Sequence, residues 1–146
     1  MVAYVVSMSL NAYSEILGTV GCLPAETGGL LLWPADSEHV SDFWFDRNAS
    51  CTGATYSPDA TTMNAMLRDV WRPQGLDWKG FVHSHPRGFD HLSPGDMSYI
   101  ARLLLGSPDM SSFIAPIVLP ELFSFRTFVV LKDNPGIAIP ARLHIN

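Results

Sequence analysis

The stretch HSHPRGFDHLSPGD, from His83 to Asp96, does most to decide the fold of this chain. An apolar run, Gly80 to Val82, leads into two histidines at alternate positions, and a proline follows them directly. In a strand, residues two apart point to the same face, and a residue that precedes proline is kept out of the helical region. The stretch therefore predicts a strand over 80–85 whose end presents the imidazoles of His83 and His85 on one side.

The second half of the stretch predicts a helix over 94–105. Ser93 is a preferred N-cap residue, Pro94 suits the first helical position, and Asp96 stands where a capping box places its carboxylate. Apolar residues then recur at helical spacing: Met97, Ile100, Ala101 and Leu104. A helix cap alone accounts for Ser93 and Asp96, and a histidine at a strand end is often only a hydrogen-bonded polar group.

A metal site is the alternative that joins the two halves of the stretch. If the helix begins beside the strand end, the Asp96 carboxylate reaches the same point as His83 and His85. Two nitrogens and one oxygen leave the fourth tetrahedral position free for water, which is the composition of a catalytic zinc site rather than a structural one. The capped helix and the metal site remain two open interpretations of these residues.

A metal-dependent hydrolase also needs a general base to move protons. Three glutamates precede the histidines, namely Glu15, Glu26 and Glu38. Glu15 is predicted on the solvated face of a helix and Glu38 in a turn, whereas Glu26 precedes a predicted buried strand over 29–33. Glu26 is therefore the favoured base.

The rest of the chain alternates short strands and helices. Periodicity and Gly/Pro punctuation predict two further helices and four further segments of strand beside 29–33 and 80–85. The helices cover 9–20 and 59–71, with a polar loop over 47–58, and the strands cover 39–46, 113–119, 122–131 and, as an edge strand, 137–145. This order predicts a mixed α/β (α+β) fold, a sheet flanked by helices, in a single domain over residues 1–146.

Composition excludes several classes of protein. The chain has 146 residues, a hydrophobic fraction of 47%, a charged fraction of 16% and a net charge of −5. The chain contains no block of Lys and Arg that would predict nucleic-acid binding, and it contains no apolar run long enough to predict a membrane span. The N-terminus lacks the pattern of a signal peptide, and no CxxC pair predicts a structural zinc knot. We expect a soluble, cytoplasmic protein.

Glu26, His83-Ser84-His85 and, after seven further residues, Ser93-Pro94-Gly95-Asp96 together resemble the JAMM motif of the JAB1/MPN/Mov34 metallopeptidases. Glu26 in ETGG before an apolar strand is similar to the prokaryotic branch of that family. The resemblance implies an MPN fold with a curved mixed sheet. It also implies a zinc-dependent peptidase or isopeptidase that cleaves after the C-terminal glycine of ubiquitin or a ubiquitin-like protein.

Carried over to this sequence, the motif implies that His83, His85 and Asp96 hold one zinc ion. Glu26 would act as general base and then as general acid toward the leaving amine, and Ser93 would donate a hydrogen bond to the oxyanion. The chain is short for a linkage-specific deubiquitinase, so we expect a compact prokaryotic enzyme that matures or removes a ubiquitin-like modifier or sulfur carrier. Activating and conjugating enzymes are then the expected associated partners.

The mode of substrate binding is also predicted. A glycine-ended tail can add to an exposed strand edge, for which segment 39–58 is the candidate. Trp33, Trp44 and Phe89 are candidates for an apolar patch that contacts the body of the modifier, although core packing is the simpler interpretation of Trp33.

Two rival functions follow from the same residues. His83-x-His85 followed by Asp90-His91 is similar to the H-x-H-x-D-H motif of metallo-β-lactamase-like hydrolases, but the spacing differs by three residues. Two metal ions per chain would favour that rival. The second rival is an MPN scaffold module in a larger assembly, and the sequence also leaves open a domain taken from a longer polypeptide.

Overall fold

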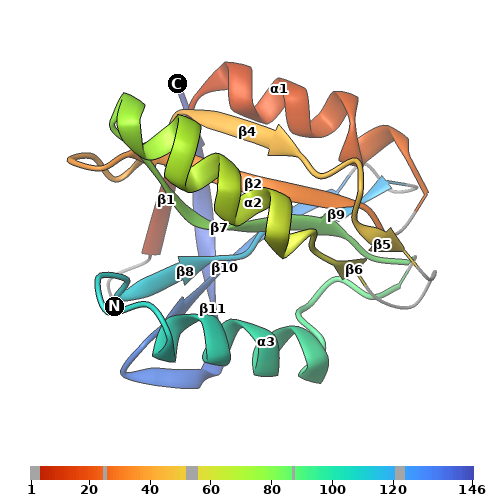
Figure 1. The fold of residues 1–146 in the computed structure, drawn as a ribbon. Helices are drawn as coiled ribbons and strands as arrows, with labels where there is room; N and C mark the ends of the chain where they lie inside the picture. Colours follow the sequence, from red (N-terminus) through yellow and green to blue (C-terminus); the bar gives the residue numbers. More distant parts are fainter. Residues whose placement is uncertain (1–3, 25, 52–55, 87, 121–123) are drawn as a thin grey trace.

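The computed structural model describes residues 4–24, 26–51, 56–86, 88–120 and 124–146 (Figure 1). Its helical elements are α1 (Leu10–Gly18), η1 (Val20–Cys22), α2 (Ala60–Met66), the π-helical turn η2 (Leu67–Trp71), η3 (Arg72–Gln74) and α3 (Pro94–Leu105). Its strands are β1 (Tyr4–Met8), β2 (Gly28–Pro34), β3 (His39–Val40), β4 (Asp42–Phe45), β5 (Ser50–Cys51), β6 (Tyr56–Ser57), β7 (Leu76–Ser84), β8 (Ser112–Ile114), β9 (Ile117–Leu119), β10 (Ser124–Leu131) and β11 (Asn134–Ile145). In the described residues, no helix is long and apolar enough to cross a membrane.

A strongly curved mixed sheet organises the fold. Its strand order is β3-β1-β11-β10-β8-β7-β2-β4, and β9 bridges β10 and β7. The strands β3 and β4 follow one another in the chain, yet β3 pairs with β1 and β4 pairs with β2 at opposite ends of this order. The single residue Ser41 lies between them and donates its N–H to the Leu32 carbonyl. Only a sheet that curls back on itself can place its two ends this close, so the expected curved mixed sheet is confirmed.

Helices cover both faces of the central strands. One buried cluster joins α2, η2 and α3 to the sheet, with Met63, Ile100 and Leu104 among its members. The other cluster joins α1 to the opposite face, where Ile16 is fully buried. Consecutive residues of β2 belong alternately to the two clusters, so both faces of this strand are buried. This is why its sequence is a continuous apolar run. In Figure 1, α1 lies at the top of the molecule and α3 at the bottom.

Close strand packing near the middle of β7 depends on glycine. A Cβ on Gly80 would overlap the carbonyl oxygen of Ile114 in the neighbouring strand β8. Glycine is the residue that allows a backbone to approach this closely. The run that leads into the histidines is therefore held firmly against its parallel neighbour.

Most predicted elements lie where the sequence placed them. The helix expected over 94–105 is α3 with the same bounds, and Ser9 caps α1 by accepting a hydrogen bond from the Ala12 N–H at 3.1 Å. The helix expected over 59–71 is regular only to Met66 and continues as the π-helical turn η2. Its cap is Asp59, which accepts from the Thr62 N–H at 3.2 Å.

Four expectations about strands were wrong. The strand expected over 39–46 is divided at Ser41 into β3 and β4, which pair with β1 and β2 respectively. The segment 113–119 is not one strand, because Pro116 interrupts it and leaves β8 and β9 to pair with different parts of β10. The tail strand β11 is not an edge, because β1, which we did not predict, pairs with it in parallel. The loop over 47–58 contains the short antiparallel pair β5 and β6.

Candidate metal centre

The two histidines of the motif lie at the end of β7, on one side of the strand, as expected. His83 and His85 retain 5% and 2% of their accessible surface, so both imidazoles are buried. Their Nε2 atoms lie 2.8 Å apart. Hydrogen bonds from the backbone N–H of His83 to the Pro116 carbonyl (3.3 Å) and from that of His85 to the Val118 carbonyl (3.0 Å) hold this strand end in place.

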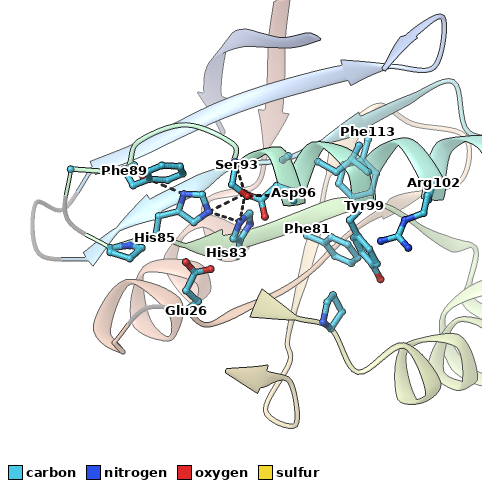
Figure 2. A pocket seen from close by; sticks show the side chains of 16 residues that line it. Glu26, Phe81, His83, His85, Phe89, Ser93, Asp96, Tyr99, Arg102 and Phe113 are labelled. Atoms are coloured by element: carbon cyan, nitrogen blue, oxygen red, sulfur yellow. Dashed lines mark hydrogen bonds and ion pairs between the residues drawn. The ribbon is translucent and has the colours of Figure 1, made fainter. Parts of the chain in front are cut away.

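Ser84, between the histidines, ties the strand end to the segment that carries Glu26. Its backbone N–H donates to the Thr27 carbonyl at 2.8 Å, and its hydroxyl oxygen accepts from the Thr27 N–H at 3.0 Å. The neighbouring residue, Glu26, is 5% exposed and faces the two imidazoles (Figure 2). Glu26, His83 and His85 each offer a ligand atom, and all three atoms lie within 4.8 Å of one another, so they could hold a metal ion.

The start of α3 brings Asp96 to the same point. The Asp96 N–H donates to Ser93 Oγ at 3.0 Å, and Asp96 Oδ2 accepts from the Ser93 N–H at 2.9 Å, which completes a capping box. The same Oδ2 lies 3.3 Å from His83 Nε2 and 3.1 Å from His85 Nε2. The capped helix and the convergence on the imidazoles are therefore both present, and the capping box orients the Asp96 carboxylate toward the two imidazoles.

The hydrogen bonds around His85 fix which of its nitrogens is free. Nδ1 lies 3.2 Å from the Phe89 carbonyl oxygen, which can only accept, so Nδ1 carries the hydrogen. In the neutral ring, Nε2 then presents a lone pair to Asp96 Oδ2 and to His83 Nε2. Lone pairs and a carboxylate at such distances repel one another unless a proton or a cation lies between them. This donor set suits a divalent metal bound by nitrogen and oxygen.

The pKa values of Asp96 and His85 shift in the direction that favours a carboxylate beside a positive charge, whereas that of His83 shifts the other way. Burial opposes ionisation of Asp96, but hydrogen bonds with His83 and His85 outweigh it and hold the pKa of this carboxyl far below its usual range. Burial lowers the pKa of His83. Burial acts in the same direction on His85, but the hydrogen bond and charge of Asp96, together with Glu26, raise its pKa above the ordinary value.

The loop between β7 and α3 packs over His85. The ring of Phe89 lies 5.1 Å from the His85 ring and 4.3 Å from the His91 ring, measured between centroids. Arg126 on β10 holds the loop through an ion pair of 2.8 Å with Asp90. Asp90 and His91 thus contact other residues. The group of possible metal ligands found in the described part of the chain is Glu26, His83 and His85, and Asp96 adjoins it through its contacts with both imidazoles.

A pocket of about 740 Å³ opens beside the buried histidines. Glu26, Ser93 and Asp96 lie along its wall together with both histidines. The pocket continues along α3 past an aromatic region that includes Phe81 and Tyr99, and reaches Arg102 (Figure 2). All five residues singled out from the motif therefore meet at one pocket.

Sequence reasoning missed the residues that support this centre. Two signals could have revealed some of them. The middle serine of HSH indicates the backbone link through Ser84, and the residue spacing along α3 indicates that Tyr99 and Arg102 follow Asp96 toward one side of the helix. No local pattern signals the pairing of Asp90 with Arg126, since the two residues lie 36 positions apart.

The predictions about substrate-facing elements have a mixed outcome. β4, within segment 39–58, is the last strand of the sheet order, as an exposed edge requires. The apolar patch of Trp33, Trp44 and Phe89 does not form. Trp33 packs beside one buried cluster and Trp44 beside the other, on opposite faces of the sheet, and only Phe89 lies at the pocket.

Comparison with known proteins relates this fold to a family. A family described as prokaryotic homologs of the JAB domain matches residues 16–128. The solution structure of a protein from Desulfitobacterium hafniense has a TM-score of 0.69 at 20% identity, covering 97% of this chain and 92% of that one. The crystal structure of a JAB1/MPN domain protein from Archaeoglobus fulgidus has a TM-score of 0.52 at 14% identity, covering 94% and 96%. None of the curated proteins matches in sequence. At these identities the two structures show the fold, a mixed α/β architecture shared with a JAB1/MPN domain.

Proposed function

Because the chain belongs to the family of prokaryotic JAB-domain homologues, we propose that it is a zinc-dependent peptidase or isopeptidase that cleaves after the C-terminal glycine of a ubiquitin-like protein. One observation carries the proposal. The side chains of His83, His85 and Asp96 converge on one buried point, with Glu26 facing it. The two-nitrogen, one-oxygen donor set is that of a catalytic zinc site, and a single zinc ion per chain fits it.

A zinc ion bound by these residues supplies Lewis acidity, which lowers the pKa of water to about 7. Glu26, which faces the two imidazoles, would take a proton from the attacking water and return it to the leaving amine. Because the Phe89 carbonyl fixes the hydrogen of His85 on Nδ1, Nε2 is the nitrogen whose lone pair would bind the ion.

Ser93 contributes through its hydroxyl hydrogen. The cap uses Ser93 Oγ as an acceptor, so its hydrogen remains for an acceptor in the pocket. As negative charge develops on the carbonyl oxygen of the substrate, this hydrogen bond strengthens. Ser93 thereby serves as helix cap and as oxyanion donor with different parts of the same group.

The substrate is proposed to be a ubiquitin-like modifier or sulfur carrier, or a conjugate of one, with an extended glycine-ended tail. Such a tail can enter the pocket beside the histidines, and β4, which ends the sheet order in the described residues, can offer main-chain hydrogen bonds to it. Associated activating or conjugating enzymes are the proposed partners. Both linear fusions and lysine isopeptides present the same scissile carbonyl to this centre.

The test joins metal content to cleavage. The chain and its Glu26→Gln variant are loaded with zinc, the zinc per chain is measured, and both are incubated with ubiquitin-like proteins that carry C-terminal extensions. One zinc ion in each and cleavage after glycine only by the unmodified chain support the proposal. Two metal ions per chain would favour the metallo-β-lactamase-like alternative, and failure to bind zinc would leave the scaffold function as the better explanation.

A further inference from the structure

The pocket has a second region that the proposed chemistry does not use. Its floor is formed by the buried rings of Phe81 and Phe113, whose centroids lie 5.3 Å apart in an edge-to-face arrangement. Tyr99 on α3 stacks on Phe81 with centroids 5.9 Å apart. Figure 2 shows these three rings and Arg102 together on one side of the histidines. We call Phe81, Tyr99, Phe113 and Arg102 the aromatic arm.

The far end of the aromatic arm carries a positive charge. Arg102 is exposed, and its guanidinium lies over the Tyr99 ring at 5.5 Å. Among the described residues it forms no ion pair. A ligand that complements this pocket therefore has an apolar group over the rings and a negative charge beside Arg102.

The length of the arm gives the position of that charge. Asp96 and Arg102 are six residues apart on α3, which corresponds to about 9 Å along a helix axis. An extended peptide covers about 3.3 Å per residue. About three residues thus separate a scissile glycine at the metal centre from a residue that faces Arg102.

We propose that the aromatic arm selects the tail of the substrate, by holding an apolar side chain over Phe81 and Tyr99 and an acidic side chain beside Arg102, about three residues before the scissile glycine. This inference rests on the proposed function and makes it more specific. The tail is chosen as occupant because every substrate of the proposed reaction has one, whereas only linear fusions have a free carboxylate on the amine side. Arg102 and Tyr99 are then specificity-determining residues, and basic tails are disfavoured.

Binding of labelled peptides tests the arm separately from catalysis. Peptides of sequence X-Leu-Gly-Gly, with X as Glu, Gln or Lys and fluorescein on an N-terminal spacer, are titrated into the zinc-loaded Glu26→Gln variant and followed by fluorescence anisotropy. We expect the Glu peptide to bind about 2- to 5-fold more tightly than the Gln peptide, and the Lys peptide to bind most weakly. Replacement of Leu by Ser is expected to weaken binding roughly tenfold.

A charge reversal provides the decisive comparison. In Arg102→Glu the order is expected to invert, so that the Lys peptide binds best, which a variant that merely unfolds cannot produce. Arg142→Glu, at an exposed position of β11 outside the pocket, is the matched control for net charge and should keep the original order. An unchanged order in Arg102→Glu, or no binding of any peptide at millimolar concentration, would overturn the inference.

Cleavage separates this inference from the proposed function. If the predicted binding order is found but the unmodified zinc-loaded chain cleaves no glycine-ended probe, the proposed hydrolysis fails while the arm keeps its assignment. If cleavage occurs with equal kcat/KM for acidic and basic tails and the binding order is flat, the hydrolysis stands and the selectivity fails.

Discussion

The double use of Ser93 yields the sharpest prediction. Replacement of Ser93 by alanine removes the acceptor for the Asp96 N–H, at a cost to stability of about 1 kcal/mol. For a domain of this size, that change lowers Tm by about 3 °C. The Asp96 carboxylate keeps its bond from the backbone N–H of residue 93, so zinc affinity should change little. Loss of the oxyanion donor should instead lower kcat by about 100- to 1,000-fold.

Glycine at the same position separates the two roles. As an N-cap, glycine costs only a few tenths of a kcal/mol relative to serine, so Ser93→Gly should unfold at nearly the original temperature. It lacks the hydroxyl, so its kcat should fall as far as that of Ser93→Ala. Thermal unfolding at fixed zinc concentration and cleavage of a glycine-ended fusion measure both effects. Near-normal turnover by the glycine variant would refute the oxyanion role and leave Ser93 as a cap only.

Four other predictions concern the base, the loop, the metal and the strand packing. Glu26→Gln should lower kcat by about 100-fold or more while zinc per chain, measured by atomic absorption, stays the same. Asp90→Ala removes the ion pair with Arg126 that holds the loop over His85, so it should weaken zinc binding in a chelator titration. The loss should be only a few-fold, because the pair is half exposed. Because Asp96 and Glu26 raise the pKa of His85, protons compete with zinc for this ring below that pKa, so zinc affinity measured by calorimetry should fall as the pH is lowered. Gly80→Ala should destabilise the chain by about 3 kcal/mol or more in thermal unfolding, whereas Gly18→Ala, where a Cβ has open space, should not.

The centre could be predicted because its signals are local. His83, His85, Ser93 and Asp96 lie within one strand–loop–helix unit, where spacing alone decides which side chains share a face. Glu26 needed the resemblance to the JAMM motif, since its contact with the histidines is made through the pairing of β2 with β7. Position before a buried strand favoured it over the other glutamates but did not place it at the site.

The part of the fold that could not be predicted depends on pairing between distant segments. Pro140 in β11 is a reason to expect an edge strand, because proline cannot donate to a neighbouring strand. The structure avoids this conflict. β1 pairs with β11 only from Ala141 onward, past the proline, and the antiparallel partner β10 takes the preceding part. Nothing within residues 137–145 reveals that Tyr4–Met8 will lie beside them.

The cap and the metal site at Asp96 turn out to be complementary rather than competing explanations. The capping box accounts for the bonds to the Ser93 and Asp96 N–H groups, but it leaves unexplained why two imidazole nitrogens lie within 3.3 Å of the same carboxylate oxygen. Without a metal ion, either the neutral His85 ring would place a lone pair against a negative charge or the buried site would have to hold a proton there, and the cap requires neither arrangement. Because the same carboxylate begins α3 and faces the histidines, metal binding should stabilise the start of that helix. Zinc should therefore slow hydrogen exchange of the Asp96 and Met97 amides more than that of amides at the end of α3, and equal protection along the helix would contradict this coupling.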